Sequence, residues 1–299
     1  MSASTAAAWF QGIRPRTLTA ALVPVMVATA LAFMLSGPAG LPHPELSFFA
    51  LLSAAFIQIG TNLFNDALDF KKGADTENRI GPKRVTQSGL LSYRAVWWGG
   101  FACFLISALL AIPLILAAGQ VIVVIGLFSL VAGYLYTGGP YPLAYLGLGD
   151  LFVLIFFGWV AVLGMMAIHG SDTGFPAWIA GTQVGLLGVV LIAINNFRDH
   201  QGDRLAGKST LAVRFGPRFA RAEIVSATWV PFFLGYFWFH SGFTAAAALP
   251  LLALPLAWRL SVRILKTEPS SEYNRLLGQA ALIQLIFGAL LTAGLLLGR

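Results

Sequence analysis

The chain has 299 residues, of which 58% are hydrophobic and only 10% carry a charged side chain. Ordinary soluble domains carry roughly 25% charged residues, so the composition excludes a soluble globular protein and predicts an integral membrane protein. The formal net charge of +7 would suit a nucleic-acid binder. The basic residues lie between apolar runs, however, and this distribution excludes nucleic acid as a partner.

Nine apolar runs follow one another along the chain, each near the roughly 20 residues that a spanning helix needs. They cover residues 17–36, 46–66, 95–117, 119–137, 143–168, 177–197, 219–240, 243–262 and 276–297. A lipid-exposed backbone must satisfy its hydrogen bonds within each segment, so the sequence predicts an all-α protein with nine transmembrane helices. The first run is longer than the apolar core of a signal peptide, and we expect no cleaved leader.

The basic residues also predict the orientation. Placing the N-terminus inside puts every Lys and Arg except Arg299 on the cytoplasmic side, as the positive-inside rule requires. Nine spans then give a multi-pass protein with its N-terminus inside and its C-terminus outside. Topology alone would explain most of these charges.

Two acidic clusters end apolar runs on that same side. Asn62, Asp66 and Asp69 end the second run with the spacing i, i+4, i+7, which puts them on one face of a helix. Asn195, Asp199 and Asp203 end the sixth run with the spacing i, i+4, i+8. Each cluster is followed by a basic loop.

The recurrence of the pattern four helices apart predicts two related halves of four helices, roughly 14–137 and 143–262, with a ninth helix at 276–297. We expect one polytopic domain over residues 1–299, built around a central cavity that opens to the cytoplasmic side.

Carboxylates this close together repel one another in a low dielectric, and a hard divalent cation removes the problem. Mg²⁺ prefers oxygen ligands and typically binds through one or two carboxylates plus substrate phosphates. The basic side chains beside the clusters suit phosphate oxygens: Lys71, Lys72, Lys83, Arg84, Arg198, Arg204 and Lys208. Together these features predict a diphosphate substrate with a lipid tail.

Three other interpretations compete with this one. A single acidic cluster at a helix end is most often a cap with a solvated loop, but two matching clusters on one side weaken that explanation. Intramembrane carboxylates also mark ion pathways, although transporter sites usually lie near the bilayer midplane. An ion-coupled transporter therefore remains the second hypothesis and a membrane scaffold the third.

The residues around the clusters resemble a known family. Residues 62–92 and 195–216 are similar to the two aspartate-rich motifs of the UbiA superfamily of intramembrane prenyltransferases. Four further stretches resemble its 1,4-dihydroxy-2-naphthoate polyprenyltransferase branch: Arg14-Pro-Arg-Thr-Leu18, Arg79-Ile-Gly-Pro82, Tyr145-Leu-Gly-Leu-Gly-Asp150 and Asn195-Asn196. The general superfamily pattern has another Asp four residues after Asp69, where this chain has Gly73 and then Asp75.

The resemblance implies transfer of a polyprenyl group from polyprenyl diphosphate to 1,4-dihydroxy-2-naphthoate, with loss of CO2 and diphosphate. The product would be demethylmenaquinone, made for menaquinone biosynthesis in the bacterial cytoplasmic (inner) membrane with Mg²⁺ as cofactor. The alternative is a prenyltransferase that acts on another aromatic acceptor, such as 4-hydroxybenzoate.

The resemblance and the chemistry of the clusters give three sets of candidate residues. The candidate metal ligands are Asp66, Asp69, Asp75, Asp199, Asp203, Asn62 and Asn196. The candidate catalytic residues are Asp66, Asp69, Asp199, Asp203, Asp150, Tyr134 and Tyr136. The candidate substrate-binding residues are Arg14, Asn62, Asn65, Lys71, Lys72, Lys83, Arg84, Tyr141, Tyr145, Asn195, Asn196, Arg198, Arg204 and Lys208.

Some of these assignments have plainer explanations. The tyrosines near the end of the fourth run would stabilise an allylic cation, but an interfacial aromatic belt explains them equally well. Asp150 lies inside the fifth run, where an unpaired charge is expensive, so we expect it to face the cavity. His200 is expected to lie in a solvated loop.

Overall fold

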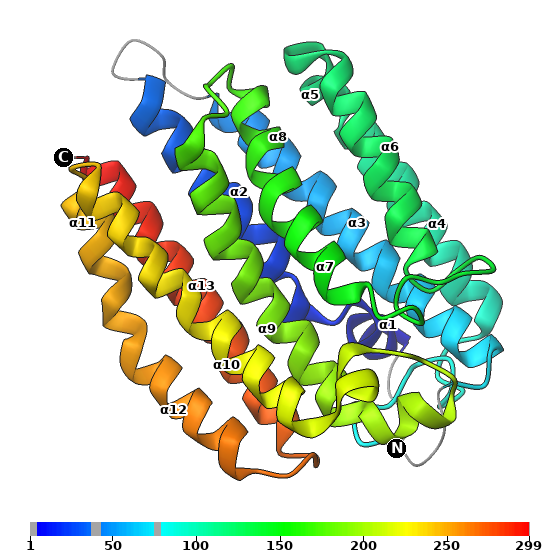
Figure 1. Cartoon of the computed structure of the whole chain (residues 1–299). Coiled ribbons are helices and arrows are strands. Elements are labelled where there is room, and N and C mark those ends of the chain that lie inside the picture. Colours follow the sequence, from blue (N-terminus) through cyan, green and yellow to red (C-terminus); the bar gives the residue numbers. More distant parts are fainter. Residues whose placement is uncertain (1–4, 37–42, 75–78, 299) are drawn as a thin grey trace.

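The computed structural model describes residues 5–36, 43–74 and 79–298, and every regular element in these ranges is a helix. Long helices run alongside one another across the molecule (Figure 1). The first part of the chain forms α1 (Thr5–Ile13), η1 (Pro15–Thr17), α2 (Thr19–Ser36), α3 (Pro44–Lys71), α4 (Tyr93–Leu110), α5 (Ile112–Ala118) and α6 (Gln120–Leu135). The remainder forms α7 (Gly149–Leu154), η2 (Ile155–Val160), α8 (Ala161–Ile168), α9 (Phe175–Leu205), α10 (Leu211–His240), α11 (Thr244–Ala248), η3 (Leu249–Ala253), α12 (Leu254–Lys266) and α13 (Tyr273–Leu297).

Seven helical stretches of the described chain are long and apolar enough to cross a membrane, which makes the chain a multi-pass membrane protein. They are Thr19–Ser36, Pro44–Lys71, Tyr93–Ala118, Gly149–Ile168, Phe175–Leu205, Thr244–Lys266 and Tyr273–Leu297. The other two predicted runs are also helical. They lie in α6, which is only 16 residues long, and in α10, which is kinked at Gly216.

The fifth predicted run begins later than the sequence indicated. Residues 143–148 form a loop, and α7 begins at Gly149. Gly147 has a φ of 70°, a conformation that glycine adopts at no steric cost, and its position leaves no room for a side chain because a Cβ would lie 2.4 Å from the carbonyl oxygen of Ser209. Hydropathy did not reveal this loop because its residues are mostly apolar.

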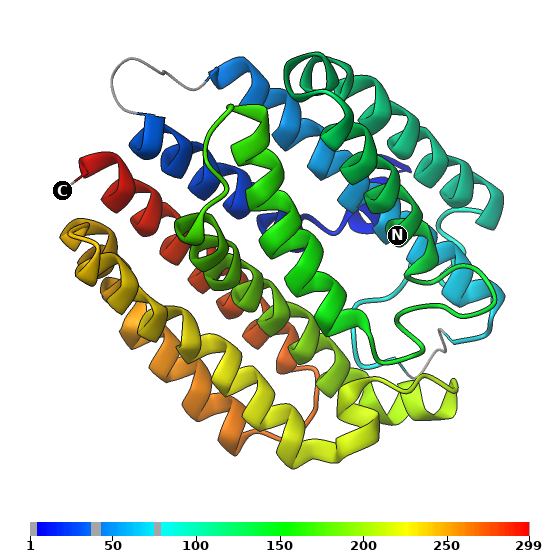
Figure 2. The same cartoon turned by 45° about the horizontal axis from the view of Figure 1, so that its top comes forward.

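Two helices extend beyond their apolar runs and carry the acidic clusters with them. α3 continues to Lys71 and α9 continues to Leu205, so both clusters are helical. The two helices end at the same end of the molecule (Figure 1). α9 lies in the interior, where it packs against α10, α13 and η2 (Figure 2).

The contact between α9 and the α7–η2–α8 span depends on glycine. A Cβ on Gly158 of η2 would lie 2.5 Å from the carbonyl oxygen of Gly181, so only glycine permits this approach. η2 is a single π-helical stretch, a local widening of the helix that often occurs at functional sites.

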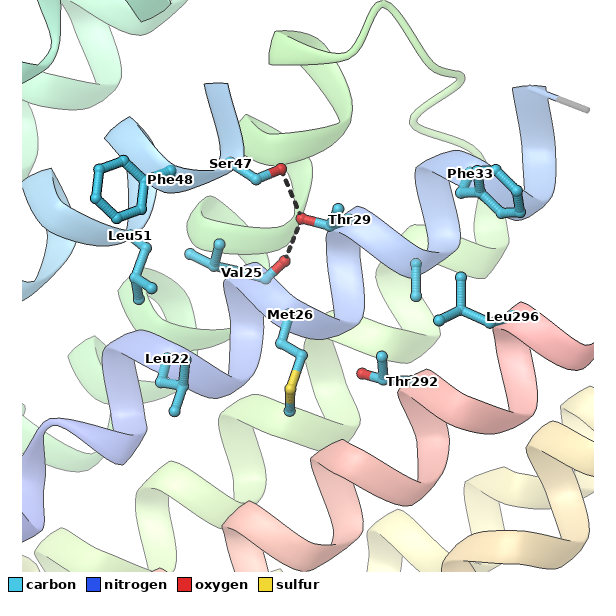
Figure 3. Close-up of a pocket in the computed structure, with 11 residues that line it drawn as sticks. Leu22, Val25, Met26, Thr29, Phe33, Ser47, Phe48, Leu51, Thr292 and Leu296 are labelled. Carbon is cyan, nitrogen blue, oxygen red and sulfur yellow. Dashed lines mark hydrogen bonds between the residues drawn. The ribbon is translucent and has the colours of Figure 1, made fainter. Parts of the chain in front are cut away.

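An apolar groove of about 400 Å³ lies between α2, α3 and α13 (Figure 3). The Thr29 hydroxyl donates to the carbonyl oxygen of Val25 at 2.7 Å and shares a hydrogen bond with Ser47 at 2.9 Å. The lining residues that the structure describes include no charged side chain. This groove therefore has none of the charged groups that a diphosphate would need.

Candidate active site

A second, larger cavity of about 670 Å³ brings the two acidic clusters together. Its lining includes all three predicted residues from α3 and all three from α9: Asn62, Asp66, Asp69, Asn195, Asp199 and Asp203. The predicted helical faces therefore point into one shared space. Asp75 lies outside the described residues.

Positive charge is in excess around this cavity. Its described lining holds four carboxylates, Asp66, Asp69, Asp199 and Asp203, against seven cationic side chains, Arg14, Arg16, Arg79, Lys83, Arg84, Arg198 and Lys208. Interactions between charges strengthen where water is excluded. The polar end of the cavity is therefore suited to an anion that carries several negative charges.

Asp69 is the most heavily hydrogen-bonded carboxylate of the first cluster. It is fully buried, and its Oδ1 accepts a hydrogen bond from the Tyr145 hydroxyl at 2.9 Å. Its Oδ2 accepts from Lys208 Nζ at 2.9 Å and from Asn65 Nδ2 at 3.2 Å. Three side chains from different parts of the chain thus converge on this one group.

Asp66 and Asn62 tie α3 to neighbouring segments. Asp66 accepts the backbone N–H groups of Val85 and Thr86. Asn62 Nδ2 donates to the carbonyl oxygen of Ile13 and to the Thr17 hydroxyl, each at 3.0 Å.

Asn65 accepts hydrogen bonds from two arginines. Its Oδ1 accepts from Nη2 of Arg14 and from Nη2 of Arg84, each at 3.0 Å. Arg14 adopts a left-handed conformation with φ of 56°, which is uncommon for a residue with a side chain. Two guanidinium groups thus meet at one neutral oxygen beside Asp69, an arrangement that suits a phosphate group.

The second cluster is held by ion pairs. Arg198 binds Asp199 in a bidentate manner, with Nε to Oδ1 at 2.8 Å and Nη2 to Oδ2 at 2.7 Å. Arg79 Nη2 also donates to Asp199 Oδ2 at 3.0 Å, and Arg198 Nη1 donates to Asn274 Oδ1 at 2.7 Å. A Cβ on Gly81 would lie 2.5 Å from Arg198 Nη2, so glycine at this position makes room for the guanidinium.

The donor set of the cavity fits Mg²⁺. Among the described residues, no three His, Cys, Asp or Glu side chains gather closely enough to form a metal site by themselves. Mg²⁺, however, usually needs only one or two carboxylates, with water and phosphate completing its coordination. The Lys208 ammonium lies 2.9 Å from Asp69 Oδ2 and 3.8 Å from Asp203 Oδ1, so the space between α3 and α9 already accommodates a cation.

The other part of the cavity is apolar and aromatic. Its lining includes Phe152, Phe156 and Phe157 from α7 and η2, and the rings of Phe152 and Phe156 stack with centroids 5.6 Å apart. Tyr136 lines the cavity as well. An uncharged hydrocarbon tail is the kind of group that such walls accept.

The remaining predicted tyrosines and Asp150 lie outside this lining. Tyr134 packs edge-on against Phe64, and Tyr141 is 75% exposed. Tyr145 is absent from the lining, although its hydroxyl donates to the lining residue Asp69. Asp150 is buried, and its Oδ2 accepts a hydrogen bond from Asn196 Nδ2 at 3.4 Å, so the lining residue Asn196 lies between Asp150 and the cavity.

Three of the predicted bases do not line the cavity. Lys71 is exposed at the end of α3, and Arg204 is exposed with a hydrogen bond to the carbonyl oxygen of Val213. Lys72 Nζ donates to the carbonyl oxygen of Thr137 at 2.6 Å and lies 4.6 Å from the centre of the Tyr145 ring. Burial lowers the pKa of the Lys72 ammonium, while the charge of Asp69 opposes that shift.

The structure adds residues that the sequence did not single out as site residues. Arg79 and Asn274 line the cavity and hold Asp199 and Arg198 respectively. Thr137, which is buried, accepts a hydrogen bond from Asn65 at 2.9 Å. Arg79 stands in one of the stretches that carry the family resemblance, whereas Asn274 and Thr137 have no sequence signal of their own.

These features can be set beside known proteins. The chain matches the UbiA prenyltransferase family over residues 25–296, nearly its whole length, and belongs to that family. It is similar to two proteins named 1,4-dihydroxy-2-naphthoate octaprenyltransferase. The one from Escherichia coli is 37% identical over 72% of this chain and 70% of its own, and the one from Haemophilus influenzae is 32% identical over 97% and 96%.

The fold has solved counterparts. A UbiA homologue from Archaeoglobus fulgidus, solved bound to GPP and Mg²⁺, superposes with a TM-score of 0.70 and 18% identity, covering 96% of this chain and 99% of its own. At 18% identity this similarity establishes only the fold.

Proposed function

We propose that this chain transfers a polyprenyl group from polyprenyl diphosphate to 1,4-dihydroxy-2-naphthoate, releasing CO2 and diphosphate and forming demethylmenaquinol, the reduced form of demethylmenaquinone. The observation that carries the proposal is one cavity in which a charged end, with seven cationic and four carboxylate side chains among the described residues, joins an aromatic and aliphatic end. The named relatives supply the identity of the acceptor.

The basic side chains would bind the diphosphate and stabilise it as it leaves. Arg14 and Arg84 meet at Asn65, and Arg198 lies across the cavity on α9. Guanidinium groups form paired, charge-assisted hydrogen bonds to phosphate oxygens. Donors already in place where negative charge develops lower the barrier to departure of the diphosphate.

Asp69, Asp199 and Asp203 would hold Mg²⁺, with Asn62 and Asn196 as neutral oxygen donors. When bound, Mg²⁺ would neutralise charge on the departing diphosphate. Lys208 would then exchange its bonds to Asp69 and Asp203 for the phosphate oxygens. The Lys208 ammonium would need to move only a short way, because Lys208 also lines the cavity.

The apolar walls would protect the allylic cation that forms when the carbon–oxygen bond breaks. Exclusion of water prevents its capture by hydroxide or water, and the faces of Tyr136 and Phe156 would stabilise positive charge. The ring carbon that carries the carboxyl group of the naphthoate then forms the new carbon–carbon bond. The carboxyl group leaves as CO2, and its bonding electrons restore the aromatic ring. Asp150 would act on the acceptor through Asn196.

We extend the proposal to the topology. One domain would cross the bacterial inner membrane nine times, with related halves at roughly 14–137 and 143–262 and a ninth helix at 276–297. The N-terminus would lie inside and the C-terminus outside, and the cavity would open to the cytoplasm. The shared end at which α3 and α9 finish supports this arrangement (Figure 1), because the basic loops follow those helices.

The test uses the purified chain in lipid vesicles with a polyprenyl diphosphate, 1,4-dihydroxy-2-naphthoate and Mg²⁺. Prenylated product and released CO2 are measured, with EDTA and 4-hydroxybenzoate as controls. We expect product with the naphthoate that EDTA abolishes. Product only with 4-hydroxybenzoate would keep the reaction and overturn the acceptor, while no metal-dependent product would favour an ion-coupled transporter.

A further inference from the structure

The segment after α3, residues 79–91, carries basic side chains that line the polar end of the cavity: Arg79, Lys83 and Arg84. We call it the basic segment. Val85 in its middle is fully buried and belongs to the same small apolar cluster as Leu63 of α3. The basic segment is therefore seated on α3 beside the cavity.

Asp66 joins the basic segment to α3. Its Oδ2 accepts the backbone N–H of Val85 at 3.1 Å, and its Oδ1 accepts the backbone N–H of Thr86 at 3.0 Å. Asp66 is only 1% exposed. Hydrogen bonds from backbone N–H groups to a carboxylate are charge-assisted and strong, so both oxygens are engaged with the main chain of the basic segment.

Asp69, one helical turn further on, is engaged differently. Its oxygens accept hydrogen bonds from the side chains of Asn65, Tyr145 and Lys208, and a side chain can change its partner by rotation while the backbone stays in place. The backbone amides that bind Asp66 lack this freedom, because they move only if the whole basic segment moves. Of the two carboxylates, Asp69 is the one arranged to exchange its present partners for a metal ion.

The hold of Asp66 on the main chain extends to the arginine pair. Arg84 directly precedes Val85, and its guanidinium meets Arg14 at the carboxamide oxygen of Asn65. Resting on the proposed function, we infer that Asp66 is a positioning residue that fixes the basic segment for the diphosphate and does not ligate the metal. This replaces the metal-ligand role that the sequence pattern predicted for Asp66.

Asp66→Asn tests the inference, because it preserves the size of the side chain but replaces one acceptor oxygen with an NH2 donor. Three quantities are measured on the purified full chain: hydrogen exchange in peptides covering residues 83–91, binding of Mn²⁺, and binding of geranyl diphosphate in the presence of Mn²⁺. We expect faster exchange, roughly tenfold weaker geranyl diphosphate binding, and Mn²⁺ affinity within about twofold of the unaltered chain. Asp69→Asn is the matched comparison, expected to lose Mn²⁺ affinity without faster exchange in the basic segment.

Two outcomes would overturn the inference. One is a loss of Mn²⁺ affinity in Asp66→Asn as large as that in Asp69→Asn, and the other is unchanged exchange at residues 83–91. Should Asp66→Asn fail to fold, Thr86→Pro removes one of the two donors and leaves every carboxylate in place. It should weaken geranyl diphosphate binding and leave Mn²⁺ binding intact, and loss of Mn²⁺ binding there would count against the inference.

Failure of the proposed function has a different signature. The unaltered chain would then form no prenylated product with any acceptor. The exchange and Mn²⁺ measurements do not depend on that reaction, and they would still decide whether Asp66 anchors the basic segment or binds metal.

Discussion

The acidic clusters at the ends of α3 and α9 resemble each other in sequence but differ in how the structure holds them. In the first cluster Asp66 and Asp69 are 1% and 0% exposed, and backbone amides bind one of them. In the second cluster the side chains of Asp199 and Asp203 are 13% and 14% exposed. Their partners are arginine and lysine side chains, with no backbone amide among the described contacts.

This difference assigns distinct tasks to the two helices. On the α3 side of the cavity, which we call the α3 wall, packing and main-chain hydrogen bonds fix Asp66, while side-chain donors hold Asp69. The α9 cluster is held by ion pairs that can re-form with a phosphate or a metal without moving the backbone. Preorganised groups contribute most to catalysis, so damage to the α3 side should cost more activity than equivalent damage to the α9 side.

The largest expected effect follows from Asp69→Asn compared with Asp203→Asn. Asp69 accepts hydrogen bonds from three side chains, so its neutralisation should lower kcat/KM by about 10³-fold. Among the described residues the Asp203 carboxylate has one ion pair, with Lys208 at 3.8 Å, and its neutralisation should cost about 10- to 100-fold. Initial rates of prenyl transfer at saturating Mg²⁺ provide the measurement. Equal losses in both variants would erase the proposed asymmetry.

Arg198→Gln breaks the ion pair that holds the α9 cluster. Removing the bidentate partner of Asp199 leaves that carboxylate with Arg79 as its ion-pair partner among the described residues, and it removes a guanidinium from the cavity wall. We expect KM for the polyprenyl diphosphate to rise about 10- to 100-fold, with a smaller change in KM for the acceptor.

Arg259→Gln is the matched control for this variant. Arg259 lies on α12, is exposed and does not line the cavity, so its kinetics should match those of the unaltered chain. An equal rise of both KM values in Arg198→Gln would indicate general distortion of the cavity in place of a lost phosphate contact.

Tyr145→Phe separates the hydroxyl of Tyr145 from its ring. The hydroxyl donates to Asp69 at 2.9 Å, whereas the ring lies 4.6 Å from Lys72 Nζ and 5.1 Å from Lys208 Nζ. Because Phe keeps the ring, we expect a loss of about tenfold in kcat/KM, from one hydrogen bond to a charged acceptor. Tyr236→Phe, at an exposed tyrosine of α10, should show no loss. A normal rate in Tyr145→Phe would mean that Lys208 and Asn65 hold Asp69 without help.

The sequence predicted which residues share the cavity far better than it predicted what each of them does. The spacing of Asn62, Asp66 and Asp69 placed them on one helical face, and the structure has all three in the cavity lining. Spacing could not separate Asp66 from Asp69, because both lie on that same face. The two residues differ in role because different segments pack over their carboxylates, and those contacts depend on the tertiary fold.

The same reasoning explains what the sequence missed. Asn274 accepts a hydrogen bond from Arg198, 76 residues away in the sequence. The sequence around Asn274 predicts only the start of a helix. Tyr134 and Tyr141 are close to Tyr136 in sequence, but their side chains do not line the cavity. Tyr134 lies on α6 and packs on Phe64, whereas Tyr141 lies in the loop after α6 and is exposed.

The smallest expected effect follows from Thr137→Val, which removes one neutral hydrogen bond at the edge of the α3 wall. Thr137 is 1% exposed, and its hydroxyl accepts a hydrogen bond from Asn65 Nδ2 at 2.9 Å. Val has nearly the same shape, so the packing and the backbone carbonyl that Lys72 contacts should remain. One such bond contributes about 1 kcal/mol, which corresponds to roughly a fivefold fall in kcat/KM if Asn65 must be fixed to hold Arg14 and Arg84.

Thr292→Val makes the same chemical change in the apolar groove between α2, α3 and α13 (Figure 3) and should leave the rate unaltered. If the two variants behave alike, Asn65 does not depend on Thr137 for its orientation. A fivefold difference between them would instead show that the fixed character of the α3 wall extends to its outermost hydrogen bond. In that case rigidity distinguishes the wall formed by α3 from the one formed by α9, since each carries two carboxylates.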